Sequence, residues 1–76
     1  MDDLIKILES VKPGYDYRKE TSLIDDEILN SFDIISIVAK INNEFNIKFP
    51  VYEIIPENFN NVKDLYKVIK RLKNKQ

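Results

Sequence analysis

Apolar residues recur at helical spacing in three separate segments of this 76-residue chain. In residues 31–45 the stripe consists of Ile34, Ile37, Val38, Ile41 and Phe45, and Ile35 widens it. This spacing places the side chains on one face of a helix. Residues 2–12 and 61–73 repeat the pattern, and no segment alternates apolar and polar residues as a half-buried strand does. The sequence therefore predicts an all-α fold.

Proline and asparagine residues set the expected boundaries of these helices. Pro13 and Gly14 end the first helix, and Asn30 or Ser31 can cap the second. We expect Asn60 or Asn61 to cap the last helix.

A short helical turn is expected over residues 51–55, between Pro50 and Pro56. Its expected apolar anchors are Val51, Ile54 and Ile55.

The first connection, over residues 13–30, is long for so small a chain. We expect its aliphatic residues to dock on the core while the acidic residues 25–27 face water; the aliphatic residues are Leu23, Ile24, Ile28 and Leu29. The overall expectation is a single domain over residues 1–76, folded as a small four-helix bundle. The bundle has three longer helices, one short helix and a long first loop.

Nine aliphatic residues from the three longer helices are expected at the centre of the core. They are Leu4, Leu8, Val11, Ile34, Val38, Ile41, Val62, Leu65 and Ile69. The four tyrosines are expected to be packing residues with polar tips; they are Tyr15, Tyr17, Tyr52 and Tyr66.

Missing residue types argue against most kinds of enzyme. The chain has no Cys and no His, so it has neither a thiolate nucleophile nor the usual general base near neutral pH. Its single glycine, Gly14, cannot build a glycine-rich phosphate loop. Residues 25–27 do not have the spacing of a calcium loop, so we expect no metal site. The chain is therefore expected not to be an enzyme.

The charges are balanced overall but unevenly distributed. The net charge is −1, yet residues 1–61 carry −6 and residues 62–76 carry +5. The negative part contains Ser31, and the basic part is either an interaction surface or simply a solvated helix face. Nothing else in the sequence supports nucleic-acid binding. The sequence contains no run of about 18 apolar residues, so no membrane span is predicted. A cytoplasmic monomer is expected.

Ser31 lies where the acidic connection meets a strongly apolar helix. At the start of a helix its hydroxyl can face solvent, and the free backbone N–H groups and helix dipole there favour an anion such as a phosphate ester. The simpler interpretation is that Ser31 only caps the helix.

Residues 25–38 resemble the attachment region of acyl carrier proteins. The motif of that family is Asp-Ser-Leu at the start of the second helix, followed further on by a Glu-Phe pair. This chain has Asn30-Ser31-Phe32 and Glu44-Phe45. Residues 46–50 resemble the family's exit from the second helix, and residues 54–65 resemble its short third helix and the start of its last one. The resemblance covers nearly the whole chain.

The resemblance implies a carrier that holds an acyl or aminoacyl group as a thioester on a 4′-phosphopantetheine group attached to Ser31. Its implied partners are a phosphopantetheinyl transferase, an acyl- or aminoacyl-activating ligase, and a downstream transferase or synthase of lipid or secondary-metabolite biosynthesis. The expected docking surface consists of Asp25, Asp26, Glu27, Asn30, Phe32 and Asp33.

Three features of the sequence refine this expectation. The family usually has Asp where this chain has Asn30, and Phe32 replaces the usual Leu or Met. The aliphatic pair Ile28-Leu29 is more similar to specialised, D-alanyl or aminoacyl carriers than to the housekeeping fatty-acid carrier. The alternative function is an unmodified helical protein-interaction module that shares the carrier fold.

Overall fold

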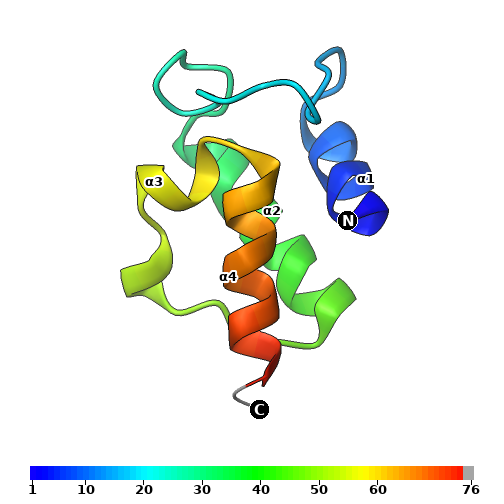
Figure 1. Cartoon of the computed structure of the whole chain (residues 1–76), viewed down its shortest axis with the longest axis vertical. Coiled ribbons are helices and arrows are strands. Elements are labelled where there is room, and N and C mark those ends of the chain that lie inside the picture. The colour runs from blue at the N-terminus through cyan, green and yellow to red at the C-terminus, as the bar shows by residue number, and fades with distance from the viewer. Residues whose placement is uncertain (75–76) are drawn as a thin grey trace.

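The computed structural model describes residues 1–74, and these residues form helices with no strand among them (Figure 1). The elements are α1 (Asp2–Val11), α2 (Ser31–Phe45), the 3-10 turn η1 (Val51–Glu53), α3 (Pro56–Phe59) and α4 (Val62–Asn74). The predicted all-α fold is therefore confirmed, with the three longer helices α1, α2 and α4 and with two short helical segments, η1 and α3, between α2 and α4.

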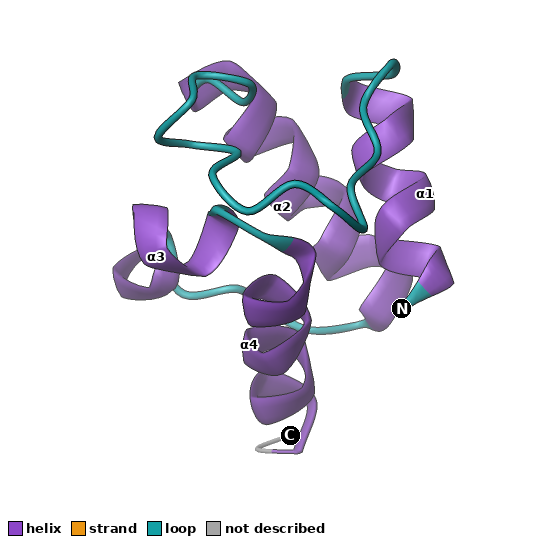
Figure 2. Cartoon of the chain, turned by 45° about the horizontal axis from the view of Figure 1, so that its top comes forward, coloured by secondary structure: helices purple, strands orange, loops and turns teal. Residues whose placement is uncertain are grey.

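The helices pack around one core, with the first connection across one end of the bundle. α1 packs against α2 and α4, and α3 packs against α4. Figure 1 shows α4 in front of α2 with α1 beside them, and Figure 2 shows the first connection passing over the end of the bundle where α2 begins. This arrangement brings the long connection next to Ser31.

The centre of the core is made by residues that are almost fully buried in several elements. The largest of them are Leu4, Leu8, Tyr17, Leu23, Ile37, Ile41, Phe59, Leu65 and Ile69. Three residues that were expected at the centre, namely Val11, Ile34 and Val38, are only partly buried and pack against the edge of this cluster. α2 therefore turns Ile37 and Ile41 inward, and Ile35 is 67% exposed rather than part of the buried stripe.

The short segment between α2 and α4 differs from its prediction. η1 ends at Glu53, and a separate helix begins at Pro56, which is the residue that was expected to end the turn. Proline fits the first position of a helix because its missing N–H would have no intrahelical partner there. The expected anchor Val51 is 84% exposed and Ile55 is 38% exposed, whereas Ile54 packs against the core.

The tyrosines divide between core and surface. Tyr17 is buried and its hydroxyl donates a hydrogen bond to the carbonyl oxygen of Lys12, as expected for a packed ring with a bonded hydroxyl. Tyr66 is partly buried against the core. Tyr15 and Tyr52 are exposed, so the expectation that they pack was wrong. No helix in residues 1–74 is long and apolar enough to cross a membrane.

Candidate functional site

The first turn of α2 is closed by a reciprocal pair of hydrogen bonds between Asn30 and Asp33. The side-chain oxygen Oδ1 of Asn30 accepts from the backbone N–H of Asp33 at 2.9 Å, and Oδ2 of Asp33 accepts from the backbone N–H of Asn30 at 3.0 Å. This is a capping box, in which two helix-end donors are satisfied by side chains. Asn30 is therefore the cap, and α2 begins at Ser31.

Ser31 is exposed, and its hydroxyl has no hydrogen-bond partner among residues 1–74. The interpretation of Ser31 as the cap is wrong, because Asn30 already occupies that position. A serine that does not cap the helix keeps both lone pairs of its hydroxyl oxygen available. Its side chain is therefore free for chemistry with another molecule.

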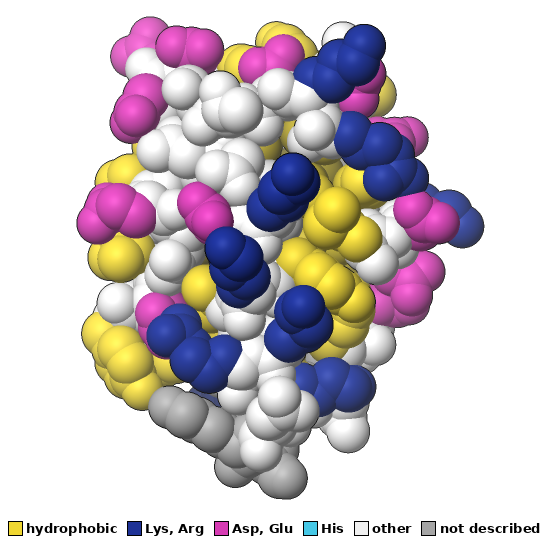
Figure 3. Space-filling view, viewed as in Figure 1, with side chains coloured by type: hydrophobic (Ala, Val, Ile, Leu, Met, Phe, Trp, Pro, Cys, Tyr) yellow, Lys and Arg dark blue, Asp and Glu magenta, His cyan; other side chains and the backbone are white. Residues whose placement is uncertain are grey.

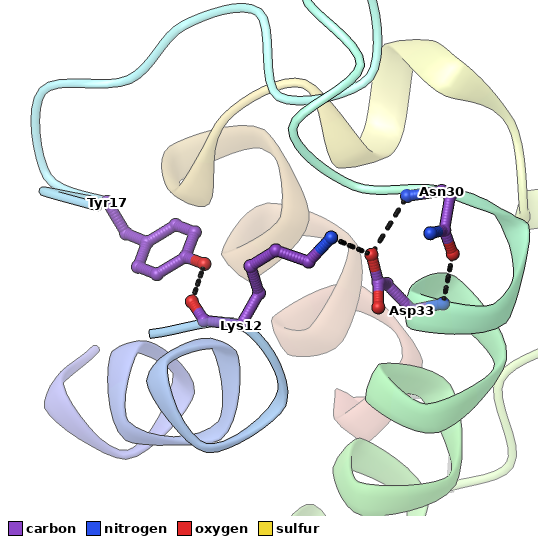
Figure 4. A network of polar contacts seen from close by, with 4 residues as sticks. All are labelled: Lys12, Tyr17, Asn30 and Asp33. Atoms are coloured by element: carbon purple, nitrogen blue, oxygen red, sulfur yellow. Dashed lines mark hydrogen bonds and ion pairs between the residues drawn. The ribbon is translucent and has the colours of Figure 1, made fainter. Parts of the chain in front are cut away.

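A charged contact from α1 supports the cap (Figure 4). Nζ of Lys12 lies 2.9 Å from Oδ2 of Asp33, whose side chain is only 15% exposed. Partial burial acts to raise the pKa of Asp33, but the hydrogen bonds from Lys12 and from the Asn30 backbone outweigh it and hold the pKa below its ordinary value. Asp33 therefore remains ionised and keeps its role in the cap at neutral pH.

The acidic end of the first connection is fixed by Asn60, which lies between α3 and α4. Oδ1 of Asn60 accepts from the backbone N–H groups of Ile24 at 3.0 Å and Asp25 at 3.1 Å. The carbonyl oxygen of Asn60 accepts from the backbone N–H of Leu23 at 2.9 Å. Asn61, the neighbouring residue, is the cap of α4, because its side chain accepts from the N–H of Asp64 at 2.9 Å. The sequence alone did not show which of these two asparagines caps the last helix.

The predicted docking residues differ in their surroundings. Asp25, Asp26, Glu27, Asn30 and Phe32 are exposed, and the ring of Phe32 is 81% exposed. The carboxylate of Asp33 instead forms an ion pair with Lys12 and accepts a hydrogen bond from the backbone N–H of Asn30. Ile35, one helical turn after Phe32, adds a second exposed apolar side chain to α2.

Charges of opposite sign gather over different parts of the surface. Figure 3 shows Lys and Arg side chains over α4, and Asp and Glu side chains at the corner over the first connection. The exposed basic residues of α4 are Lys63, Lys67, Lys70, Arg71 and Lys73. Arg71 forms an ion pair with Glu53, and the ammonium group of Lys70 lies over the ring of Tyr66. The described residues contain no group of three or more acidic side chains suited to a metal ion.

The roles of three residues that support the candidate site were not identified from the sequence. Lys12 was not assigned a partner, Asn60 was expected only as a possible cap, and Ile24 was expected only to dock on the core as an aliphatic residue of the connection. Their roles depend on contacts between segments that lie far apart in the chain. A basic residue directly after one helix and an acidic residue in the first turn of another were the available signals for the Lys12–Asp33 pair.

The chain is a small helical bundle, and its second helix begins at an exposed serine without a hydrogen-bond partner in the described part of the chain, next to an acidic connection. This is the architecture of a carrier domain. The chain is 35% identical over 63 residues to "Aminoacyl carrier protein 2" of Bradyrhizobium diazoefficiens, and the match covers 83% of this chain and 70% of that protein. The chain therefore belongs to the acyl carrier protein family. No protein-family model matches it, and no solved structure gives a significant match.

Proposed function

We propose that this chain is a carrier protein whose Ser31 takes a 4′-phosphopantetheine group and which holds an aminoacyl or acyl group as a thioester. The observation that carries this proposal is the free, exposed hydroxyl of Ser31 at the first position of α2. The resemblance of Asn30-Ser31-Phe32 to the attachment motif supports the same residue. The name of the relative favours an aminoacyl group over a fatty acyl group.

The surroundings of Ser31 fit a modification of this kind. The capping box holds the backbone around the serine, so a partner enzyme meets the hydroxyl in a fixed position. During attachment the serine oxygen forms a phosphodiester bond, its proton is released, and the nucleotide part of coenzyme A departs. The attached group supplies a terminal thiol, which a chain without cysteine lacks.

Activation and transfer of the cargo belong to partner enzymes in this proposal. The chain contains no Cys and no His, so it offers neither a thiolate nucleophile nor an imidazole base of its own. The partners are a phosphopantetheinyl transferase, an acyl- or aminoacyl-activating ligase, and a downstream transferase or synthase. The chain itself positions the attachment residue and presents a surface to each partner.

The docking surface of the proposal surrounds the start of α2. Phe32 and Ile35 offer exposed apolar area, and the acidic residues 25–27 lie at its edge. Exposed charges increase the rate of encounter more than they increase affinity, so we assign the acids to steering and the apolar side chains to binding. Asn30 and Asp33 contribute by holding the first turn of α2 in place.

The test is the intact mass of the protein after incubation with coenzyme A, Mg²⁺ and a broad-specificity phosphopantetheinyl transferase. We expect the mass to increase by one phosphopantetheine group in the wild type and in Ser36→Ala, and not in Ser31→Ala. Ser36 is a matched control because it is an exposed serine on the same helix. The absence of any mass increase with several transferases would instead favour the unmodified interaction module.

A further inference from the structure

A hollow of about 330 Å³ lies directly beside Ser31, between the end of the first connection and the first turns of α2. Its lining residues are Ile24, Glu27, Leu29, Asn30, Ser31 and Ile34. Three of these are aliphatic, and Glu27, Asn30 and Ser31 supply its polar atoms. A small ligand with an apolar body and hydrogen-bonding groups matches such a lining.

The wall opposite α2 is held in place by the fold. The backbone N–H of Ile24 is bonded to the side chain of Asn60 at 3.0 Å, and the N–H of Leu29 donates to the carbonyl oxygen of Leu23 at 2.9 Å. Between them, Glu27 has a φ of 59°, and its N–H donates to the carbonyl oxygen of Ile24 at 3.0 Å. The hollow is therefore formed before any ligand arrives, which lowers the entropic cost of filling it.

We infer that this hollow receives the part of the phosphopantetheine arm nearest to Ser31, namely the pantoyl segment with its carbon that bears two methyl groups. The inference rests on the proposed function. Ser31, which would carry the arm, is one of the residues that line the hollow, and the dimethyl carbon follows the phosphate within a few bonds. A branched apolar group tethered at the rim can thus reach Ile24 and Ile34, which are both only partly buried.

The chemistry of the lining matches this segment in two further respects. The exposed parts of Ile24 and Ile34 are removed from water when methyl groups cover them, which is favourable. The carboxylate of Glu27 is an acceptor, and the pantoyl segment has hydroxyl and amide N–H donors. The far end of the arm, with its cargo, lies beyond this hollow. The contact is therefore expected with or without a cargo.

The test uses the modified full-length protein with labelled isoleucine methyl groups. NMR should show nuclear Overhauser contacts between the two methyl groups of the arm and the methyl groups of Ile24 and Ile34. No such contacts are expected with the methyl groups of Ile55, which is 38% exposed and does not line the hollow.

Two variants give a second readout. We expect the melting temperature of the wild type to be higher with the arm attached than without it. Ile24→Ala should lose most of this increase, and Ile35→Ala should keep it, because Ile35 is exposed on α2 and does not line the hollow.

The results distinguish a failure of this inference from a failure of the proposed function. If the intact mass shows the arm attached but its methyl groups contact neither Ile24 nor Ile34, the inference is overturned and the proposed function stands. Contacts that form only after a cargo is loaded would also overturn it, because the hollow would then bind the cargo. If no arm can be attached to Ser31, the inference and the proposed function fail together.

Discussion

The ammonium nitrogen of Lys12 lies 2.9 Å from a carboxylate oxygen of Asp33, and this ion pair joins the end of α1 to the first turn of α2. The same carboxylate accepts the backbone N–H of Asn30, so one side chain serves both the contact between helices and the cap. The position of Ser31, the proposed attachment residue, thus depends on Lys12, and the whole first connection lies between these two residues. The consequences can be measured through pH.

Acid should weaken the fold through Asp33. Folding lowers the pKa of this carboxyl below 3.8, so its ionised form stabilises the fold at higher pH, and this contribution is lost as the pH falls through the lower folded-state pKa. We expect Asp33→Asn to reduce the free energy of unfolding at pH 7 and to flatten its decrease below about pH 4. Chemical denaturation across this pH range measures both effects.

Asp2→Asn is the comparison variant for this experiment. The hydrogen bond and charge of Arg18 also lower the pKa of Asp2, but its side chain is 78% exposed whereas that of Asp33 is 15% exposed. Salt screens exposed pairs more strongly, so raised ionic strength should remove the Asp2 effect before the Asp33 effect. Equal salt sensitivity of the two variants would contradict the partly buried role of Asp33.

Asn30 and Ser31 should differ sharply in their effect on stability. Asn30→Ala removes the acceptor of the capping box and should cost about 0.5–2 kcal/mol in the free energy of unfolding. Asn30→Asp retains an acceptor and should stay close to the wild type. Ser31→Ala should be nearly neutral, because its hydroxyl does not cap the helix. Urea denaturation tests this, and a larger loss in Ser31→Ala than in Asn30→Ala would disprove the assignment of the cap.

Asn60→Ala should release the acidic end of the first connection. The backbone N–H groups of Ile24 and Asp25 would lose their acceptor, at a cost of roughly 1–3 kcal/mol if they stay unpaired. We expect faster hydrogen exchange at these two amides while the amides in the middle of α2 remain protected. Asn43→Ala is the control, because Asn43 is an exposed asparagine on α2. Unchanged exchange at Ile24 and Asp25 would show that Asn60 does not hold the connection.

Two isoleucines on α2 test which face of the helix is buried. Ile41 is fully buried and Ile35 is 67% exposed. Ile41→Ala should therefore cost about 2–5 kcal/mol, a large share of the stability of a domain this small, whereas Ile35→Ala should change it little. Thermal denaturation of both variants measures the contrast. Similar melting temperatures for the two would mean that the face is assigned wrongly.

The acidic residues 25–27 should affect how fast a partner enzyme is met. Neutralising all three should slow transfer to the partner and flatten its dependence on salt, because exposed charges act mainly on the association rate. The matched control neutralises three exposed acids outside the proposed surface, namely Asp3, Glu9 and Glu44. A wild-type transfer rate for the variant of residues 25–27 in low salt would exclude these acids from the docking surface.

Phe32 should instead affect affinity at every salt concentration. Its ring is 81% exposed in the free protein, so covering it in a complex removes a large apolar area from water. Phe32→Ala should weaken binding of a partner by about 1 kcal/mol or more, roughly fivefold in Kd. Val51→Ala is the control because Val51 is also strongly exposed but lies outside the proposed docking surface. Titration calorimetry with a partner enzyme distinguishes the two variants.

Local patterns were sufficient to predict the three longer helices but not to predict which of their faces are buried. The apolar spacing over residues 31–45 predicts α2 at its observed bounds, Ser31–Phe45. This helix carries aliphatic residues at so many positions that several faces could be buried, and packing against α1 selects Ile37 and Ile41 over Ile34 and Val38. The rotation of the helix is therefore decided by its neighbours.

The residues of the candidate site could be proposed from the sequence, but the contacts that hold them in place could not. Ser31 and the acidic residues 25–27 lie close together in the sequence, so the local pattern was enough to propose them as parts of a site. The contact from Asn60 to Ile24 spans 36 positions, and nothing in the residues near Asn60 indicates this partner. Pro56 was misjudged because proline can end one helical segment or begin the next, and only the fold decides.

The anchoring of the first connection through Asn60 has a practical consequence for engineering hybrid carriers. A designer who grafts residues 13–30 onto another carrier to change its choice of enzymes would transplant the acids but leave their tether behind. The grafted segment would then lack the amide that shapes it, and its specificity would not transfer. A successful graft would therefore have to transfer residues 13–30 together with Asn60, although the two are far apart in the sequence.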